Sequence, residues 1–164
     1  MNTSIRFLTV VGIAIGMTAC EYASDSMADA AADENGAQES EIVTEWLTSY
    51  EKAIEKSRET ERPILMNFTG SDWCPPCIQM KNDVLDTRAF KEFAKGNLVL
   101  LELDFPRTKP QKAELEQQNT ELAEKFRIQG FPTFLVVDDE GEEVRRTVGY
   151  MQGGPNAFVA WIEG

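Results

Sequence analysis

Asp72-Trp73-Cys74-Pro75-Pro76-Cys77 is the segment around which the rest of the sequence is organised. It follows an apolar run and precedes a segment with helical spacing, which predicts that both cysteines lie at the start of a helix. The thiolate is the species that attacks a disulfide, and the partial positive charge of a helix N-terminus favours it. Two thiols separated by two residues across the first helical turn come within bonding distance. The segment therefore predicts a redox pair, Cys74 and Cys77, that exchanges two electrons.

The composition limits the other kinds of chemistry. The chain has 164 residues, 42% of them hydrophobic, a formal net charge of −12 and no histidine. This length suffices for one compact domain with appendages. The lack of histidine excludes Ser-His-Asp and Cys-His catalysis and most catalytic zinc sites, and the acidic balance argues against nucleic acid as a partner. A copper-delivery site would have incomplete coordination unless two chains shared the ion. We therefore expect no metal and no cofactor, and nothing in the pattern requires more than a monomer.

Residues 1–20 have the pattern of a targeting segment. Arg6 is a basic residue ahead of an uncharged run, 7–17, that is too short to cross a bilayer comfortably. The segment resembles the lipobox of bacterial lipoproteins, in which the cysteine, here Cys20, is acylated and becomes the mature N-terminus. Met17 departs from the leucine usual in that motif. Ordinary secretory cleavage and a retained anchor are the alternatives, and each of them places the domain outside the cytoplasm.

Residues 21–40 are rich in Ala, Ser, Asp, Glu and Gly. They lack the large apolar side chains needed to offset the entropy lost on ordering. We expect a disordered acidic tether that holds the domain away from a membrane, with an acidic docking segment as the alternative.

The pattern of residues 41–164 predicts one α/β domain. Apolar positions spaced by three and four indicate an amphipathic helix over 42–54, ended by the polar cluster 56–62. The remaining expected elements, in order, are a buried strand at 63–68, helices around 77–85 and 90–94, a strand at 98–104, a polar surface excursion at 106–111, a helix over 115–126 with a polar middle that allows a kink, a strand at 134–137, a turn at 138–141, a strand at 142–148 and a last helix from Pro155. This order fits a central sheet with helices on both faces.

Two motifs together carry a family resemblance. Trp73-Cys74-Pro75-Pro76-Cys77 and Gly130-Phe131-Pro132-Thr133 resemble the corresponding motifs of thioredoxin-fold proteins, and the resemblance covers about residues 41–164. It implies a three-layer α/β/α fold with a central mixed sheet. The lead-in to the cysteines and the lengthened stretch after Asp104 are most similar to secreted bacterial thioredoxin-like domains.

The resemblance also implies a substrate-binding surface. It predicts a cis peptide before Pro132, lying against the turn that carries the cysteines. In the family, the backbone beside this proline, here Phe131, pairs with the substrate peptide as a short added strand. Trp73 would form part of an apolar contact surface beside the thiols. The alternatives are a trans proline that begins a strand and an ordinary half-buried tryptophan.

Two positions depart from the family pattern. Cytosolic thioredoxins carry a buried aspartate on the strand before the redox turn, and Asn67 occupies that place here. An amide cannot accept a proton from Cys77, so water or another carboxylate would have to do so, with Asp72 a weak candidate. Pro75 stands where glycine is common, and together with Pro76 it removes backbone N–H donors near Cys74. We expect a less stabilised thiolate and a couple that leans toward reductant.

The sequence therefore predicts an extracytoplasmic thiol-disulfide oxidoreductase that reduces protein disulfides through a mixed disulfide with Cys74, which Cys77 resolves. Its expected partners are disulfide-containing client proteins and, by resemblance, a membrane thiol-disulfide transporter as electron donor. The expected location is the bacterial periplasm, with a lipid anchor at Cys20. The alternatives are a disulfide oxidase or isomerase and a noncatalytic tethered binding module with a structural disulfide.

Overall fold

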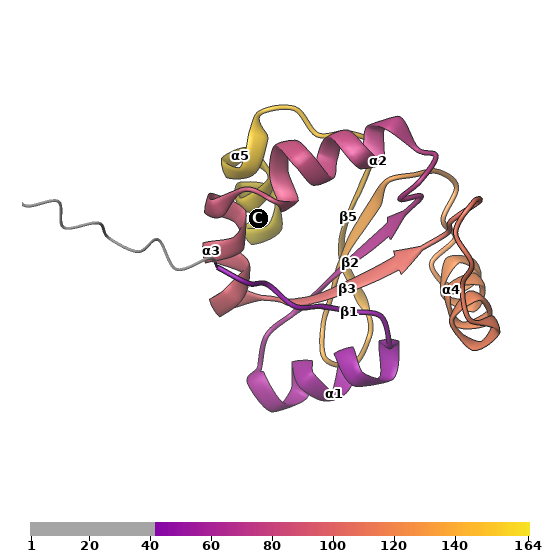
Figure 1. The fold of residues 1–164 in the computed structure, drawn as a ribbon. Coiled ribbons are helices and arrows are strands. Elements are labelled where there is room, and N and C mark those ends of the chain that lie inside the picture. The colour runs from indigo at the N-terminus through magenta and orange to yellow at the C-terminus, as the bar shows by residue number, and fades with distance from the viewer. Residues whose placement is uncertain (1–41) are drawn as a thin grey trace, which may run out of the picture. The chain divides into compact units, whose positions relative to one another are not determined.

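A computed structural model describes residues 42–164, which form a mixed five-stranded sheet with helices on both faces (Figure 1). The expected α/β architecture is therefore confirmed. The elements are β1 (Trp46–Leu47), α1 (Tyr50–Thr60), β2 (Ile64–Thr69), α2 (Pro75–Met80), the π-helix η1 (Lys81–Leu85), α3 (Arg88–Asn97), β3 (Val99–Asp104), α4 (Ala113–Lys125), β4 (Thr133–Val137), β5 (Glu143–Val148) and α5 (Gly154–Glu163).

The strand order places β2 at the centre of the sheet. The order is β1-β3-β2-β4-β5, in which β3 is parallel to both β1 and β2, while β4 pairs antiparallel with β2 and with β5. All six residues of β2 are buried. Because both faces of a central strand are covered, this strand is mostly apolar on both faces rather than alternating, with Asn67 and Thr69 as its polar residues. The redox turn, residues 72–77, follows the carboxyl end of this strand.

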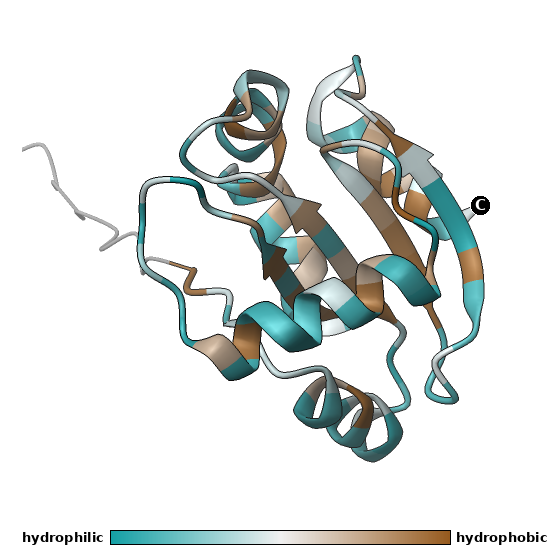
Figure 2. Cartoon of the chain, turned by 90° about the vertical axis from the view of Figure 1, so that its right-hand side faces the viewer, coloured by the Kyte–Doolittle hydropathy of each residue, from teal (hydrophilic) through white to brown (hydrophobic). Residues whose placement is uncertain are grey.

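Two hydrophobic clusters separate the helices into two layers. One lies between the sheet and α2, η1, α3 and α5, and the other packs the opposite face against α1 and α4. Alternation along the strands assigns side chains to the two faces, as with Leu65 in the first cluster and Met66 in the second. Figure 2 shows the same arrangement, with hydrophobic colour gathered on the strands and hydrophilic colour on the outer sides of the helices.

The first predicted helix was wrong in its position. Residues 42–54 were expected to be helical, but Trp46–Leu47 forms a short strand that pairs in parallel with β3. Trp46 packs against the first cluster and Leu47 against the second, so neighbouring apolar residues are used on opposite sides of the sheet. The helix begins later, after Ser49, whose side chain caps it by accepting a bond from the N–H of Lys52.

The same helix also continues through the polar cluster that was expected to end it. It runs to Thr60, because Ser57 is buried and its hydroxyl donates to the carbonyl oxygen of Arg62, which satisfies the polar group. The polar middle of α4 has a comparable explanation. Asn119 is buried and its Nδ2 donates to the carbonyl oxygen of Asp104 at 2.9 Å, so α4 is one continuous helix.

The other expected elements are confirmed within a residue or two at their ends, except that α3, expected at 90–94, continues to Asn97. Helix α2 continues directly into η1, and a separate helix α3 begins after Thr87, whose hydroxyl accepts from the N–H of Phe90. The turn between β4 and β5 uses Gly141 at φ 82°, and Pro155 lies in the first turn of α5.

The predictions for the N-terminal part of the chain lie outside the described residues. These are the signal segment 1–20, the acidic tether 21–40 and acylation at Cys20. Among the helices of residues 42–164, none combines the length and the apolar character that a membrane crossing requires.

Candidate active site

Cys74 and Cys77 form a disulfide at the start of α2, with an S–S distance of 2.02 Å. Cys74 is the N-cap of α2, and its carbonyl oxygen accepts bonds from the N–H groups of Cys77 and Ile78, both at 3.1 Å. Pro75 and Pro76 fill the first two helical positions, where an N–H would have no partner within the helix. The two cysteines are only 3% and 4% exposed. Access to the two sulfur atoms therefore depends on the surface that surrounds them.

The loop before the cysteines is a tight turn that requires glycine. The carbonyl oxygen of Gly70 accepts from the N–H groups of Trp73 and Cys74, at 3.4 and 3.0 Å. A Cβ atom on Gly70 would lie 2.5 Å from the indole ring of Trp73. The indole therefore packs directly on the glycine backbone, and this contact fixes it beside the cysteines.

The peptide bond between Phe131 and Pro132 is cis, as expected from the resemblance. The carbonyl oxygen of Pro132 accepts from the N–H of Gly149 at 2.8 Å, and the Thr133 hydroxyl donates to the carbonyl oxygen of Gly130. Phe131 is half-buried, and its ring meets the ring of Trp73 edge to face, with centroids 5.8 Å apart. The structure thus brings together two of the expected substrate-binding residues, although they are far apart in the sequence.

Two residues of this surface were missed by the sequence analysis. Phe105 lies 5.1 Å from Phe131 between ring centroids, and its carbonyl oxygen accepts from the indole N–H of Trp73 at 2.7 Å. The guanidinium carbon of Arg107 lies 3.6 Å from the centre of the Trp73 ring. The sequence did contain a signal for both residues, because they come just after β3. The carboxyl ends of neighbouring parallel strands meet at one edge of a sheet, so these residues were placed near the redox turn that follows β2.

Asp72 and Asp104 join the redox turn to the segment after β3, in a set of contacts that we call the clasp. The Asp72 carboxylate accepts from the backbone N–H groups of Arg107, Thr108 and Lys109, at 2.7 to 3.2 Å, and from the Thr108 hydroxyl. In return, the Asp104 carboxylate accepts from the N–H and the hydroxyl of Ser71, at 2.9 and 2.6 Å. The clasp holds residues 105–109 beside Trp73.

The clasp argues against Asp72 as a proton acceptor for Cys77. The hydrogen bond from the Thr108 hydroxyl, followed by that from the N–H of Arg107, holds the pKa of Asp72 far below the usual range of aspartate. A carboxylate so stabilised is a weak base. The contacts assign Asp72 to positioning the neighbouring loop.

Replacing Asp72 by Asn is expected to loosen residues 107–109. The amide keeps one acceptor oxygen but loses the charge that strengthens several bonds at once. Amide hydrogen exchange at Arg107, Thr108 and Lys109 should accelerate about tenfold, while Asp139→Asn, in the exposed β4–β5 turn, should leave these rates unchanged. Because the folded pKa of Asp72 is lowered, the clasp should be intact above the ordinary aspartate pKa and weaken only as the pH falls through the lowered value. Unchanged exchange in Asp72→Asn would show that the clasp does not depend on the charge.

Asn67 is buried on the sheet face that carries α2, and its Oδ1 has no hydrogen-bond partner within the described residues. Its register partner on β3 is Glu102. Burial, followed by the charge of Asp104, raises the pKa of Glu102 above the usual value for glutamate. This face of the sheet therefore carries a carboxyl group on β3, one strand away from the position that Asn67 occupies.

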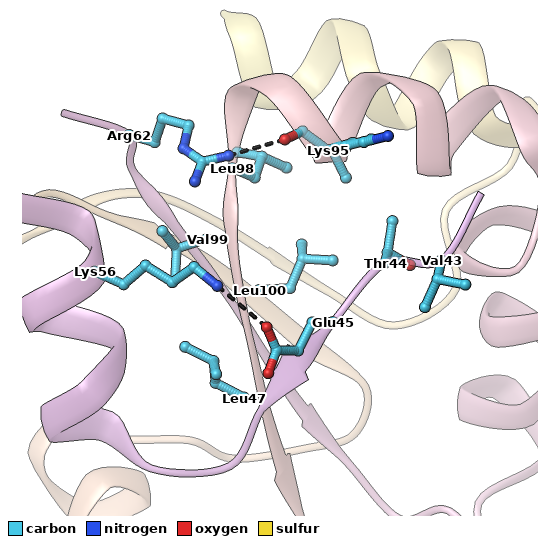
Figure 3. A pocket seen from close by; sticks show the side chains of 11 residues that line it. Val43, Thr44, Glu45, Leu47, Lys56, Arg62, Lys95, Leu98, Val99 and Leu100 are labelled. Carbon is cyan, nitrogen blue, oxygen red and sulfur yellow. Dashed lines mark hydrogen bonds and ion pairs between the residues drawn. The ribbon is translucent and has the colours of Figure 1, made fainter. Parts of the chain in front are cut away.

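Figure 3 shows a pocket that none of the residues of the redox turn lines. It lies near the amino ends of β2 and β3, where Lys56 pairs with Glu45 at 3.2 Å and Arg62 donates to the carbonyl oxygen of Lys95 at 2.9 Å. Neither cysteine of the pair lines it. Residues 42–164 contain no group of three or more His, Cys, Asp or Glu side chains that could hold a metal ion.

Comparisons with known proteins agree with this geometry. Residues 50–164 match the family described as Thioredoxin-like domain. The disulfide bond reductase DsbH of Chlamydia pneumoniae is 39% identical over 115 residues, which make up 70% of this chain and 69% of that protein. The thioredoxin-related protein DsbJ of the same species is 35% identical over 101 residues, or 62% of this chain. That match spans only 29% of DsbJ.

A solved structure points to the same family. The structure of a DsbH oxidoreductase matches with a TM-score of 0.69 at 38% identity, over 73% of this chain and 81% of that one. The resemblance expected from the two motifs is confirmed by the family match and by this likeness. The chain therefore belongs to the thioredoxin-like family of thiol-disulfide oxidoreductases.

Proposed function

We propose that the chain is an extracytoplasmic reductase of protein disulfides, with Cys74 as the attacking and Cys77 as the resolving cysteine. The observation that carries this proposal is the Cys74–Cys77 disulfide at the head of α2, close to an aromatic surface that includes Phe131 of the cis peptide. The 39% identity to a protein named as a disulfide bond reductase supports the direction of electron flow.

The proposed reaction begins with the reduced pair. The Cys74 thiolate attacks one sulfur of a client disulfide, forms a mixed disulfide and releases the other client sulfur as a thiolate. The Cys77 thiolate then attacks the Cys74 sulfur, which forms the Cys74–Cys77 disulfide and releases the second client thiolate. Two electrons pass to the client, and its two thiolates take up protons according to the pH.

The backbone of Phe131 is suited to hold the client during this reaction. Phe131 precedes β4, and within residues 42–164 its N–H and C=O bond to no other backbone group. Both are therefore open to an extended client segment, which would add a short strand beside Pro132. Trp73 and Phe131 supply the apolar contact area, and Pro75 and Pro76 hold the first turn of α2 in helical geometry.

The cellular setting of the reaction belongs to the same proposal. Signal residues 1–20 would direct the chain out of the cytoplasm, and acylation at Cys20 would anchor it to a membrane. Residues 21–40 would then form the tether to the thioredoxin-like domain at 41–164, which would be monomeric. A membrane thiol-disulfide transporter would return the oxidised pair to the dithiol. The identity to Dsb proteins supports thiol-disulfide partners.

The test of this proposal is the reduction potential of the Cys74–Cys77 couple, measured in a Cys20→Ser variant so that the pair is the only source of thiols. The protein is equilibrated with glutathione or dithiothreitol buffers. We expect a value near that of thioredoxin, about −270 mV, as suits a reductant fed from the cytoplasm. A value near about −120 mV would identify an oxidant. A pair that never equilibrates with either buffer would leave only a structural disulfide.

A further inference from the structure

Arg107 is an exposed cation held at a fixed place beside the redox turn. Its guanidinium lies over the Trp73 ring, and Trp73 directly precedes the attacking cysteine. Within residues 42–164, no carboxylate forms an ion pair with Arg107. The positive charge therefore faces solvent without a paired anion, on the surface that a client must approach.

The clasp fixes the backbone of this arginine. Its N–H donates to the Asp72 carboxylate at 3.0 Å, and the neighbouring N–H groups of Thr108 and Lys109 donate to the same carboxylate. Two residues earlier, the carbonyl oxygen of Phe105 accepts from the Trp73 indole. Because both flanks are bound to the redox turn, the backbone of Arg107 is already ordered before the guanidinium binds a partner group.

The carboxylates and the cations around the redox turn differ in how far they are already bound by neighbouring groups. Asp72 and Asp104 are saturated by hydrogen bonds from the clasp, whereas Arg107 and Lys109 are exposed. The chain as a whole has a net charge of −12, and eight of its acidic residues lie within residues 21–45. The net charge of the chain repels acidic clients at long range, but the two exposed cations are expected to attract a carboxylate close to the redox turn.

We propose that Arg107 determines client specificity, by binding a carboxylate side chain that lies next to the cysteine of the client disulfide. The planar guanidinium can keep one face on the indole while its edge donates two parallel hydrogen bonds to a carboxylate. The preferred client is therefore a protein whose disulfide has an aspartate or glutamate beside it. This inference rests on the proposed function, because it concerns the client of the same reaction.

The test uses single-turnover reduction, so that no electron donor is needed. The reduced Cys20→Ser chain is mixed with an excess of a disulfide-linked peptide pair that carries Glu, Gln or Lys beside the attacked cysteine. The second-order rate constant is followed by the appearance of the oxidised Cys74–Cys77 pair. We expect the Glu peptide to react about fivefold faster than the Gln peptide at low salt, and the Lys peptide more slowly than both. The preference should fall as salt is added.

Matched variants separate the charge from the packing. Arg107→Gln should bring the ratio of Glu to Gln rate constants to about 1, and Arg107→Lys should retain part of the preference. Arg58→Gln, at the far end of α1 where Arg58 bonds to the carbonyl oxygen of Asp139, should keep the full ratio. A wild-type ratio near 1, or one that survives Arg107→Gln, would overturn the role of Arg107 and leave the reductase proposal intact. Failure to reduce any of the three peptides would contradict the reductase proposal itself.

Discussion

Cys74→Ser is expected to abolish disulfide reduction, with a loss of at least about a thousandfold in turnover. A serine hydroxyl stays protonated at neutral pH and is a far weaker nucleophile toward sulfur than a thiolate. The measurement is dithiothreitol-driven reduction of insulin by the Cys20→Ser chain with and without the substitution. The fold should be unaffected, because serine is close to cysteine in size, and circular dichroism should confirm this.

Cys77→Ser is the matched control for that variant. It retains the attacking thiolate but cannot complete the second exchange, so it should accumulate mixed disulfides between Cys74 and clients. These adducts should appear on nonreducing gels and disappear with dithiothreitol, while Cys74→Ser forms none. Equal adduct formation by both variants would show that Cys77 also attacks clients. Rapid insulin reduction by Cys74→Ser would refute the assignment of the attacking cysteine.

The redox turn was predictable from the sequence because the signals that place it are local. An apolar run after Pro63 specifies a central buried strand, and two prolines after Cys74 specify the first turn of a helix. The Gly-Phe-Pro-Thr motif at 130–133 placed the cis peptide through the family resemblance. Each of these signals is contained in a short run of consecutive residues, so a linear pattern contains it.

The first helix was misplaced because its pattern has two readings. Apolar residues at three- and four-residue spacing fit one face of a helix, but Trp46 and Leu47 are adjacent and can also be divided between two faces of a sheet. Pairing with β3 decides between these arrangements, and that pairing joins residues more than fifty positions apart. The strand is only two residues long, which gives no alternation to detect.

The clasp could not be predicted for a related reason. Asp72 and Thr108 are 36 residues apart, and each alone is an ordinary polar loop residue. Their meeting depends on β2 and β3 being parallel and in register, so that Thr69 lies opposite Asp104 where both strands end. Only then do the two loops lie side by side and the stacking of Arg107 on Trp73 become visible. The surface that we propose to select clients therefore arises from tertiary structure, whereas the redox pair is a local motif.

Phe134→Ala is expected to cause a large loss of stability. Phe134 is 1% exposed on β4, and its ring meets that of Phe158 on α5 edge to face, with centroids 4.9 Å apart. Truncation removes buried apolar surface and this aromatic contact, and it leaves a cavity between the sheet and α5. The free energy of unfolding should fall by about 3–5 kcal/mol, as measured by urea denaturation of the oxidised Cys20→Ser chain.

The control for this variant is Val43→Ala, because Val43 is 76% exposed and lies outside any helix or strand. It should change the free energy of unfolding by less than about 0.5 kcal/mol. A loss below about 1 kcal/mol in Phe134→Ala would mean that α5 closes onto the sheet and refills the cavity.

Phe134 also affects the site, because it lies two residues after Pro132 on the strand that pairs with β2. Packing between β4 and α5 should therefore help to hold the cis peptide in place, and destabilising this layer should slow insulin reduction before the protein unfolds globally.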